Sequence, residues 1–199
     1  MPTGTAIRDV RAQLFSAAER VLLRAGPEGL TSRAVTAEAG VAKGVLHRHF
    51  ADFDAFLAEL IRDRIARLDT QASSLTAVAG TGTVAGNVTR ALFDLFDPVA
   101  VAIVGLVIFR DELRARLRST TPSGIPLLAE GIEMVRSYLT DEVELGRLAA
   151  DTDAATLALT LVGAGHMLFA DRAAGPPDTE TVESMVSLVL ADVLQRRLL

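Results

Sequence analysis

The stretch from residue 31 to 50, TSRAVTAEAGVAKGVLHRHF, contains two short helical segments separated by a glycine turn. The first segment ends at Ala39, and Gly40 supplies the turn because a residue without Cβ bends sharply at little steric cost. The second segment covers residues 43–49. Two helices with this spacing predict a helix-turn-helix, in which the second helix enters the major groove of DNA.

The side chains predicted to contact DNA form two groups. Those that start the first helix can hold phosphates through hydroxyls, backbone N–H groups and a guanidinium. In the second group, Val45 can touch a thymine methyl, and Lys43, the only lysine against 19 arginines, can read guanine or meet a phosphate. The alternative for each is a solvated surface side chain. The predicted DNA-binding residues are Thr31, Ser32, Arg33, Ala42, Lys43, Gly44, Val45, His47 and Arg48.

The distribution of charge supports a nucleic-acid partner, although the total charge does not. The chain carries a net charge of −5, which argues weakly against a protein built only to bind nucleic acid. Residues 1–50 have a net charge of +3, however, and residues 51–199 have −8. A basic head on an acidic body is therefore expected, the alternative being ordinary scatter of charge.

Composition indicates a cytoplasmic protein without a membrane partner. Half of the residues are hydrophobic and there is no cysteine, which fits a reducing compartment and excludes a disulfide scaffold or a thiolate metal site. No secretory signal is evident at the start of the sequence. The longest apolar run, Val99 to Phe109, is far shorter than the ~20 residues that cross a bilayer.

Helical periodicity continues along nearly the whole chain and predicts an all-α fold of about nine helices. We expect residues 1–52 to form a helix-turn-helix DNA-binding domain and residues 53–199 to form a helical regulatory and dimerisation domain, joined rigidly by a long helix. Glycine and proline separate the expected helices, which cover residues 7–25, 31–39, 43–49, 53–70, 84–96, 99–118, 124–144, 153–172 and 179–197.

Residues 8–60 resemble the tetracycline-repressor (TetR) family of transcriptional regulators. The matching residues are Ala17-Ala18, Gly26, Leu30-Thr31, Val35, Ala39-Gly40-Val41, Lys43-Gly44, Leu46 and His49-Phe50. The resemblance implies a DNA-binding head on a divergent helical body, which dimerises through its last two helices and often binds a small molecule. We therefore expect a repressor that binds a palindromic operator in double-stranded DNA as a homodimer and is released by a small-molecule effector.

Three positions depart from the family pattern. His47 stands where the family usually has a tyrosine, and Ala42 replaces the usual serine before the basic residue. Phe53-Asp54 stand where a lysine often follows the His-Phe pair. Each change weakens contacts with the DNA backbone, whereas none removes the fold.

The body is expected to hold a small, largely apolar ligand. Ligand pockets are mostly apolar with a few polar groups that orient the ligand, and Asn87 is a further polar candidate. The alternative is that the same apolar segments, above all Val99 to Phe109, only form the core of a helical domain. The residues predicted to line the ligand cavity are Phe93, Phe96, Phe109, Arg110, Met134, Tyr138, His166 and Phe169.

Other classes of function have less support. The sequence has no glycine-rich phosphate loop, no nucleophile elbow and no metal-ligand spacing, so we expect neither an enzyme nor a cofactor. His47 and His49 are two residues apart and point to nearly opposite sides of a helix, so they cannot share a metal ion. A helical adaptor and a DNA-binding protein without an effector stay as alternatives.

Overall fold

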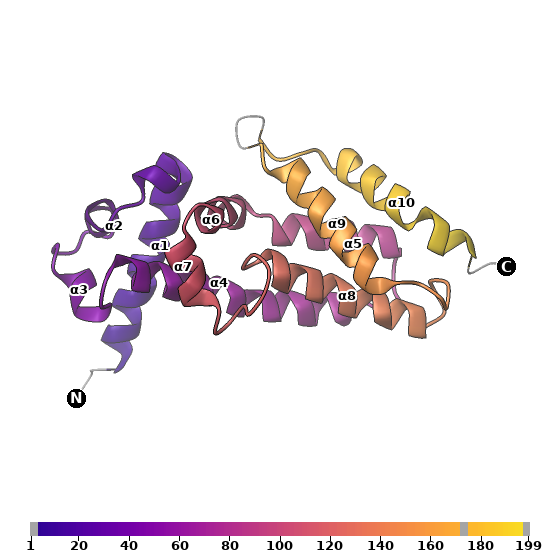
Figure 1. Cartoon of the computed structure of the whole chain (residues 1–199), viewed down its shortest axis with the longest axis horizontal. Helices are drawn as coiled ribbons and strands as arrows, with labels where there is room; N and C mark the ends of the chain where they lie inside the picture. Colours follow the sequence, from indigo (N-terminus) through magenta and orange to yellow (C-terminus); the bar gives the residue numbers. More distant parts are fainter. Residues whose placement is uncertain (1–3, 172–174, 197–199) are drawn as a thin grey trace.

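The computed structural model describes residues 4–171 and 175–196, and all the regular secondary structure in these ranges is helical (Figure 1). The all-α prediction is confirmed. The described helices, in chain order, are α1 (Gly4–Gly29), α2 (Ser32–Glu38), α3 (Val45–His49), α4 (Phe53–Thr76), α5 (Val84–Leu95), α6 (Pro98–Ile108), α7 (Asp111–Leu117), α8 (Leu128–Glu144), α9 (Ala154–Phe169) and α10 (Thr179–Arg196).

Helices α1 to α3 form a small head at one end of the molecule (Figure 1). Helix α1 packs against α2, and Leu14, Val35 and Leu46, one from each helix, are fully buried between them. Within α1, Gly26 has a φ of 68°, which interrupts the helix before Pro27. The helix end that we expected at residue 25 is therefore a kink within α1.

Helix α4 connects the head with the rest of the chain, here called the body (Figure 1). Asp52 caps α4, because its Oδ1 accepts the N–H of Ala55 at 2.7 Å. The helix then continues to Thr76, beyond the expected end near residue 70, because buried Leu75 continues its apolar face. Helix α4 packs against α5, α7 and α8, so the head and the body share one rigid element.

The body is a bundle in which α8 lies against α4 and α9, and α10 lies against α5 and α9. Helix α10 runs along its outer edge (Figure 1). Helix α6 packs on α1 and so adds a second connection between the body and the head. Most of α6 is buried, as its all-round apolar sequence predicts.

The helix expected at residues 99–118 is two helices, so the described residues form ten helices and not nine. The chain leaves the helix at Phe109 and Arg110, where the Arg110 guanidinium reaches Asp54 of α4, with 3.2 Å between Nη1 and Oδ1. Asp111 and Glu112 then start α7, where carboxylates interact favourably with the helix dipole.

Other predicted helix ends shift by a few residues. Helix α3 begins at residue 45 and not 43, and α8 begins at residue 128 and not 124. The ends expected at residues 172 and 197 lie outside the described residues.

No single helix in the described ranges is long and apolar enough to span a membrane. Only α5 and α6 taken together reach the required length and composition, and the pair is bent by 64° at its break.

Candidate nucleic-acid interface

The N-terminus of α2 is fixed by its own first residues. The Thr31 hydroxyl accepts the N–H of Ala34 at 3.1 Å, which caps the helix. At the other end, Gly40 has a φ of 67°, and the N–H of Val41 returns to the carbonyl of Thr36 at 3.0 Å. The turn between α2 and α3 therefore has a defined geometry, and the predicted role of Gly40 agrees with its positive φ.

Polar contacts from α1 brace the C-terminal end of α2. The Gln13 amide donates to the carbonyl of Ala39 at 2.8 Å. Arg20 and Arg24 both donate to Glu38, at 2.7 and 2.9 Å, and these hydrogen bonds lower the pKa of the Glu38 carboxyl. The sequence reasoning missed this brace, although Arg20 and Arg24 are four residues apart and share one helix face.

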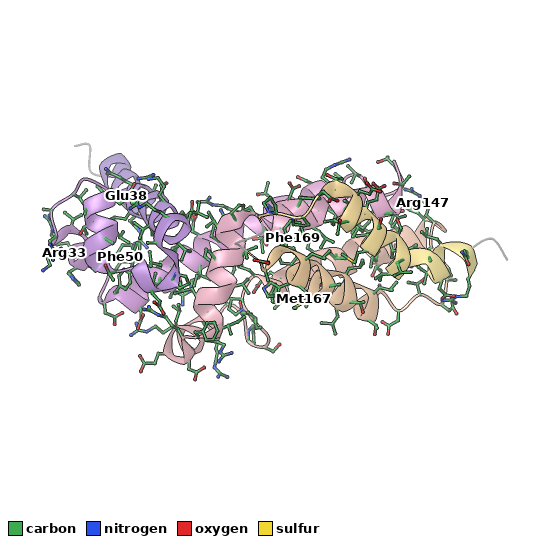
Figure 2. All side chains as sticks on the ribbon, turned by 90° about the horizontal axis from the view of Figure 1, so that it is seen from above. Arg33, Glu38, Phe50, Arg147, Met167 and Phe169 are labelled. Atoms are coloured by element: carbon green, nitrogen blue, oxygen red, sulfur yellow. The ribbon has the colours of Figure 1, made fainter. Side chains whose placement is uncertain are left out.

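An aromatic cluster holds the C-terminal end of α3. The Phe50 ring lies 5.0 Å from that of Phe56 and 6.1 Å from that of Phe15, between ring centroids. The Arg11 guanidinium covers the Phe50 ring at 4.7 Å from its centroid. Figure 2 shows Phe50 inside the head. A helix of five residues is thus held in place by the side chain that follows it.

The predicted DNA-contacting residues share one end of the head. Lys43 and Gly44 lie in the turn before α3, where the N–H of Val45 donates to the carbonyl of Ala42 at 2.9 Å. Ser32 and Val45 are half-buried. The other predicted residues are exposed, namely Thr31, Arg33, Ala42, Lys43, Gly44, His47 and Arg48.

The lysine and arginine side chains that the structure describes in the head divide into two sets. On the flanks, arginines pair with carboxylates, and the pairs are Arg11–Glu59, Arg20–Glu38 and Arg24–Glu38. In contrast, Arg33, Lys43 and Arg48 have no carboxylate partner among the described residues. Arg33 marks the far end of the head in Figure 2. Within the head, the cations without a described carboxylate partner therefore lie on the predicted DNA face.

Residues 14–60 match the model of the bacterial regulatory proteins of the tetR family. The matched segment runs from the middle of α1 into α4, and thus contains the complete helix-turn-helix. This segment of the chain is therefore a DNA-binding domain of the tetR-family type. The resemblance inferred from residues 8–60 is confirmed.

Solved structures extend the similarity from this domain to the whole fold. A protein of Mesorhizobium loti MAFF303099, assigned to the TetR-family transcriptional regulators, has a TM-score of 0.75 at 15% identity, covering 94% of this chain and 96% of that one. Reduced NemR of Escherichia coli gives 0.69 at 16% identity, covering 92% and 96%. FadR of Bacillus subtilis, solved with stearoyl-CoA, gives 0.65 at 14% identity, covering 93% and 98%. No curated protein matches the sequence.

The residues predicted to line a ligand cavity in the regulator do not lie together. Phe93, Phe96, His166 and Phe169 form one aromatic cluster between α5 and α9, where the rings of Phe96 and Phe169 are 5.4 Å apart. The other predicted residues lie elsewhere. Tyr138 is fully buried, and Phe109 is 87% exposed. Arg110 pairs with Asp54, and Met134 lines a separate cleft.

That cleft has a volume of about 270 Å³ and lies between α4, α5 and α8. Leu75, Ala91 and Met134 give it an apolar floor. Gln71 and Arg90 stand on its sides, and Arg90 is exposed with no carboxylate partner among the described residues. Of the residues predicted to line the ligand cavity only Met134 lines it, together with Asn87, the further polar candidate. No local sequence pattern indicates the cleft, because its walls come from three helices that are distant in the chain.

A buried polar cluster closes the far end of the body. The Glu142 side chain is fully buried and pairs with Arg147, with 3.2 Å between Oε2 and Nη1. Tyr138 receives a hydrogen bond from Asn87 at 3.0 Å, and burial together with the Glu142 carboxylate raises the pKa of its hydroxyl. The N–H of Gly80 donates to Glu142 at 3.3 Å, so the cluster holds the turn between α4 and α5 against α8. Figure 2 shows Arg147 at the end opposite the head.

Proposed function

We propose that this transcriptional regulator binds a palindromic operator in duplex DNA as a homodimer and acts as a repressor released by a small, largely apolar ligand. In this proposal residues 1–52 bind DNA and residues 53–199 dimerise and sense the ligand. The observation that best supports the proposal is at the tip of the head, where Arg33, Lys43 and Arg48 have no carboxylate partner among the described residues. Cations that bind DNA phosphates need no such partner within the protein.

The proposed contacts follow from the positions of these side chains. Thr31, Ser32 and Arg33 start α2 and would fix the head on phosphates. Because α3 has five residues, Lys43 reaches the DNA from the preceding turn, while His47 and Arg48 reach it from the helix itself. Val45 is half-buried and has one side open for contact with a thymine methyl.

An exposed apolar strip on α9 and α10 supports the proposed dimer. Leu159 and Met167 are 58% and 73% exposed, and they lie on one face of α9 with Gly163 between them. On α10, Leu188 is 79% exposed. A Cβ at Gly163 would meet no atom within 4 Å, so a second copy could approach closely there. The two heads would then face successive major grooves, about 34–36 Å apart.

The cleft between α4, α5 and α8 is the proposed effector site, because it combines an apolar floor with the Arg90 cation. Its wall includes α4, whose Asp52 cap is two residues beyond Phe50 of the head. A ligand that displaces α4 would therefore change the spacing of the two recognition helices in a dimer. A 100-fold preference of the ligand for the displaced state corresponds to about 2.7 kcal/mol.

A charged joint offers a second route from the cleft to the head. Helix α5 ends just before Asp97, which caps α6 by accepting the N–H groups of Val99 and Ala100 at 2.8 and 3.0 Å. Arg64 of α4 pairs with Asp97 and lies 3.5 Å from Glu19 of α1, between Nη1 and Oε1. A shift of α5 would therefore act on α1 through Asp97 and Arg64.

Selection of bound DNA from a random duplex pool tests the core of the proposal. We expect a palindrome whose two halves are one helical turn apart, bound with an affinity that falls steeply as salt rises. The variant Arg48→Gln should weaken binding at every salt concentration, whereas Arg118→Gln, at the exposed end of α7, should have little effect. Recovery of no enriched sequence, together with salt-independent binding, would favour the helical adaptor.

Sedimentation tests the dimer. Met167→Glu places a charge in the apolar strip and should give a monomer at micromolar concentration that still folds. Leu145→Glu is the matched control, because Leu145 is 56% exposed but follows α8 and lies outside the strip. A wild-type monomer, or a dimer that tolerates Met167→Glu, would contradict this part of the proposal.

Displacement of the selected DNA tests the ligand. Hexanoate, octanoate and benzoate are suitable probes, because each joins a compact apolar group to a carboxylate that Arg90 could meet. Ala91→Phe fills the floor of the cleft, so this variant should still bind DNA but lose the response. If no probe releases DNA from the wild type, the site does not bind this chemistry, and a ligand-independent DNA-binding protein becomes the better description.

A further inference from the structure

Lys43 is the only side-chain amine in the chain, which otherwise uses 19 arginines as its cations. The two groups differ in reactivity. A guanidinium stays protonated and is not a nucleophile, whereas the lysine amine loses its proton readily enough to attack a carbonyl carbon. Any reagent that transfers acyl groups to side-chain amines therefore has one target in this molecule.

The surroundings of Lys43 leave it open to such a reagent. The side chain is exposed and lies in the turn before α3. A Cβ added at Gly40 or at Gly44 would meet no atom within 4 Å, so no neighbouring group crowds the turn on either side. Lys43 also has no carboxylate or hydrogen-bond partner in the part of the chain that the structure describes. An acyl donor can reach the amine without displacing any contact.

We propose that Lys43 is an acylation site through which activated acyl groups switch off DNA binding. The neutral amine attacks the carbonyl carbon of an acyl thioester, a C–N bond forms, and the C–S bond breaks. The thiolate leaves and takes up the proton that the nitrogen loses. The products are an amide on Lys43 and a free thiol, so no oxidant or reductant is required.

The consequence follows from charge. Acylation removes the cation of Lys43 and adds a bulkier neutral group. Arg33, Lys43 and Arg48 are the unpaired head cations on the predicted DNA face, so one of these charges disappears. Because Lys43 holds no described part of the head together, the fold stays intact while the affinity for DNA falls. This step rests on the proposed DNA binding.

The test uses the full chain and acetyl-CoA as the acyl donor. After incubation, mass spectrometry of peptides locates the added acetyl group and separates Lys43 from the terminal amine. The same sample is then titrated with the selected duplex at several salt concentrations. We expect an acetyl group on Lys43, an affinity at least about tenfold lower, and a salt slope smaller by about 1.

Two variants separate the site from general effects of the reagent. Lys43→Arg has no side-chain amine, so its affinity for the duplex, measured before and after the same treatment, should not change. The double variant Lys43→Arg with Arg118→Lys moves the amine to the exposed end of α7. It should be acetylated there without loss of DNA affinity.

Each outcome decides one part of the proposal. If Lys43 stays unmodified while the lysine at position 118 of the double variant is acetylated, the site is wrong. If Lys43 is acetylated and the affinity is unchanged, the switch is wrong although the DNA-binding proposal stands. If the unmodified protein binds no duplex, the proposed function fails, and the switch fails with it.

Discussion

The head and the body of this regulator use similar helices but differ in what their side chains leave exposed. In the head, a compact core supports a tip where Arg33 and Lys43 are exposed and unpaired among the described residues. In the body, the polar groups that stand out are buried and bonded to other groups of the body, since Glu142 pairs with Arg147 and Asn87 donates to Tyr138. The exposed groups of the head therefore indicate what it binds, whereas the buried groups of the body report mainly how it is held together.

The largest expected effect tests the aromatic core of the head. Phe56 is fully buried and its ring lies within 6 Å of the rings of Phe15, Phe50 and Phe53. Phe56→Ala should lower the free energy of unfolding by about 3–5 kcal/mol, because it leaves a cavity in this cluster. Urea denaturation followed by circular dichroism measures the change.

Phe109→Ala is the matched control in the body, since Phe109 is 87% exposed. Its free energy of unfolding should stay within about 0.5 kcal/mol of the wild type. Similar losses in the two variants would mean that Phe109 is covered in solution, and the contrast between the two regions would weaken.

A medium effect is expected in the buried cluster of the body. Glu142→Gln removes the negative charge that faces Arg147. It should lower the free energy of unfolding by about 1–3 kcal/mol. The loss is limited because the arginine keeps its contacts with the carbonyls of Thr81 and Gly82. DNA binding should be unchanged, because the cluster is at the end opposite the head. Glu144→Gln, at an exposed position of the same helix, should have little effect in the same denaturation experiment.

A loss of DNA affinity in Glu142→Gln would contradict this separation. It would show that the turn between α4 and α5 influences the head through α4, and the body would then do more than hold itself together.

The same contrast explains how far the sequence could be interpreted. Leu46 and Phe50 are four residues apart in the predicted helix-turn-helix, and both are buried. The sequence of this one helix was enough to predict their burial, because residues four apart lie on the same face of a helix. Even so, the contribution of Phe15 to the aromatic core depends on a contact across 35 residues that no local pattern reveals.

In the body, the local pattern contained less information. Helix α6 is apolar on all sides, so its sequence does not show which face meets which neighbour. The break after it has no glycine or proline, and Arg110 at the break pairs with Asp54, 56 residues earlier, which no local pattern reveals. The predicted ligand-binding residues lie in different parts of the body. Their positions could not be predicted from the sequence, because each aromatic residue could pack on several neighbours.

The smallest effect concerns His166, which is half-buried in the aromatic cluster of the body, with its ring 5.9 Å from that of Phe96. Burial lowers the pKa of this imidazole, so the fold favours the neutral form. As the pH falls through the ordinary histidine pKa of about 6.5, the unfolded chain takes up a proton that the folded chain does not. The free energy of unfolding should therefore decrease between pH 7.5 and pH 5.5, and His166→Gln should flatten this decrease. His47→Gln, on the exposed face of α3, should leave it unchanged. If urea denaturation gives His166→Gln the same pH dependence as the wild type, the imidazole is solvated, and the aromatic cluster is more open than the packing of Phe96 and Phe169 indicates.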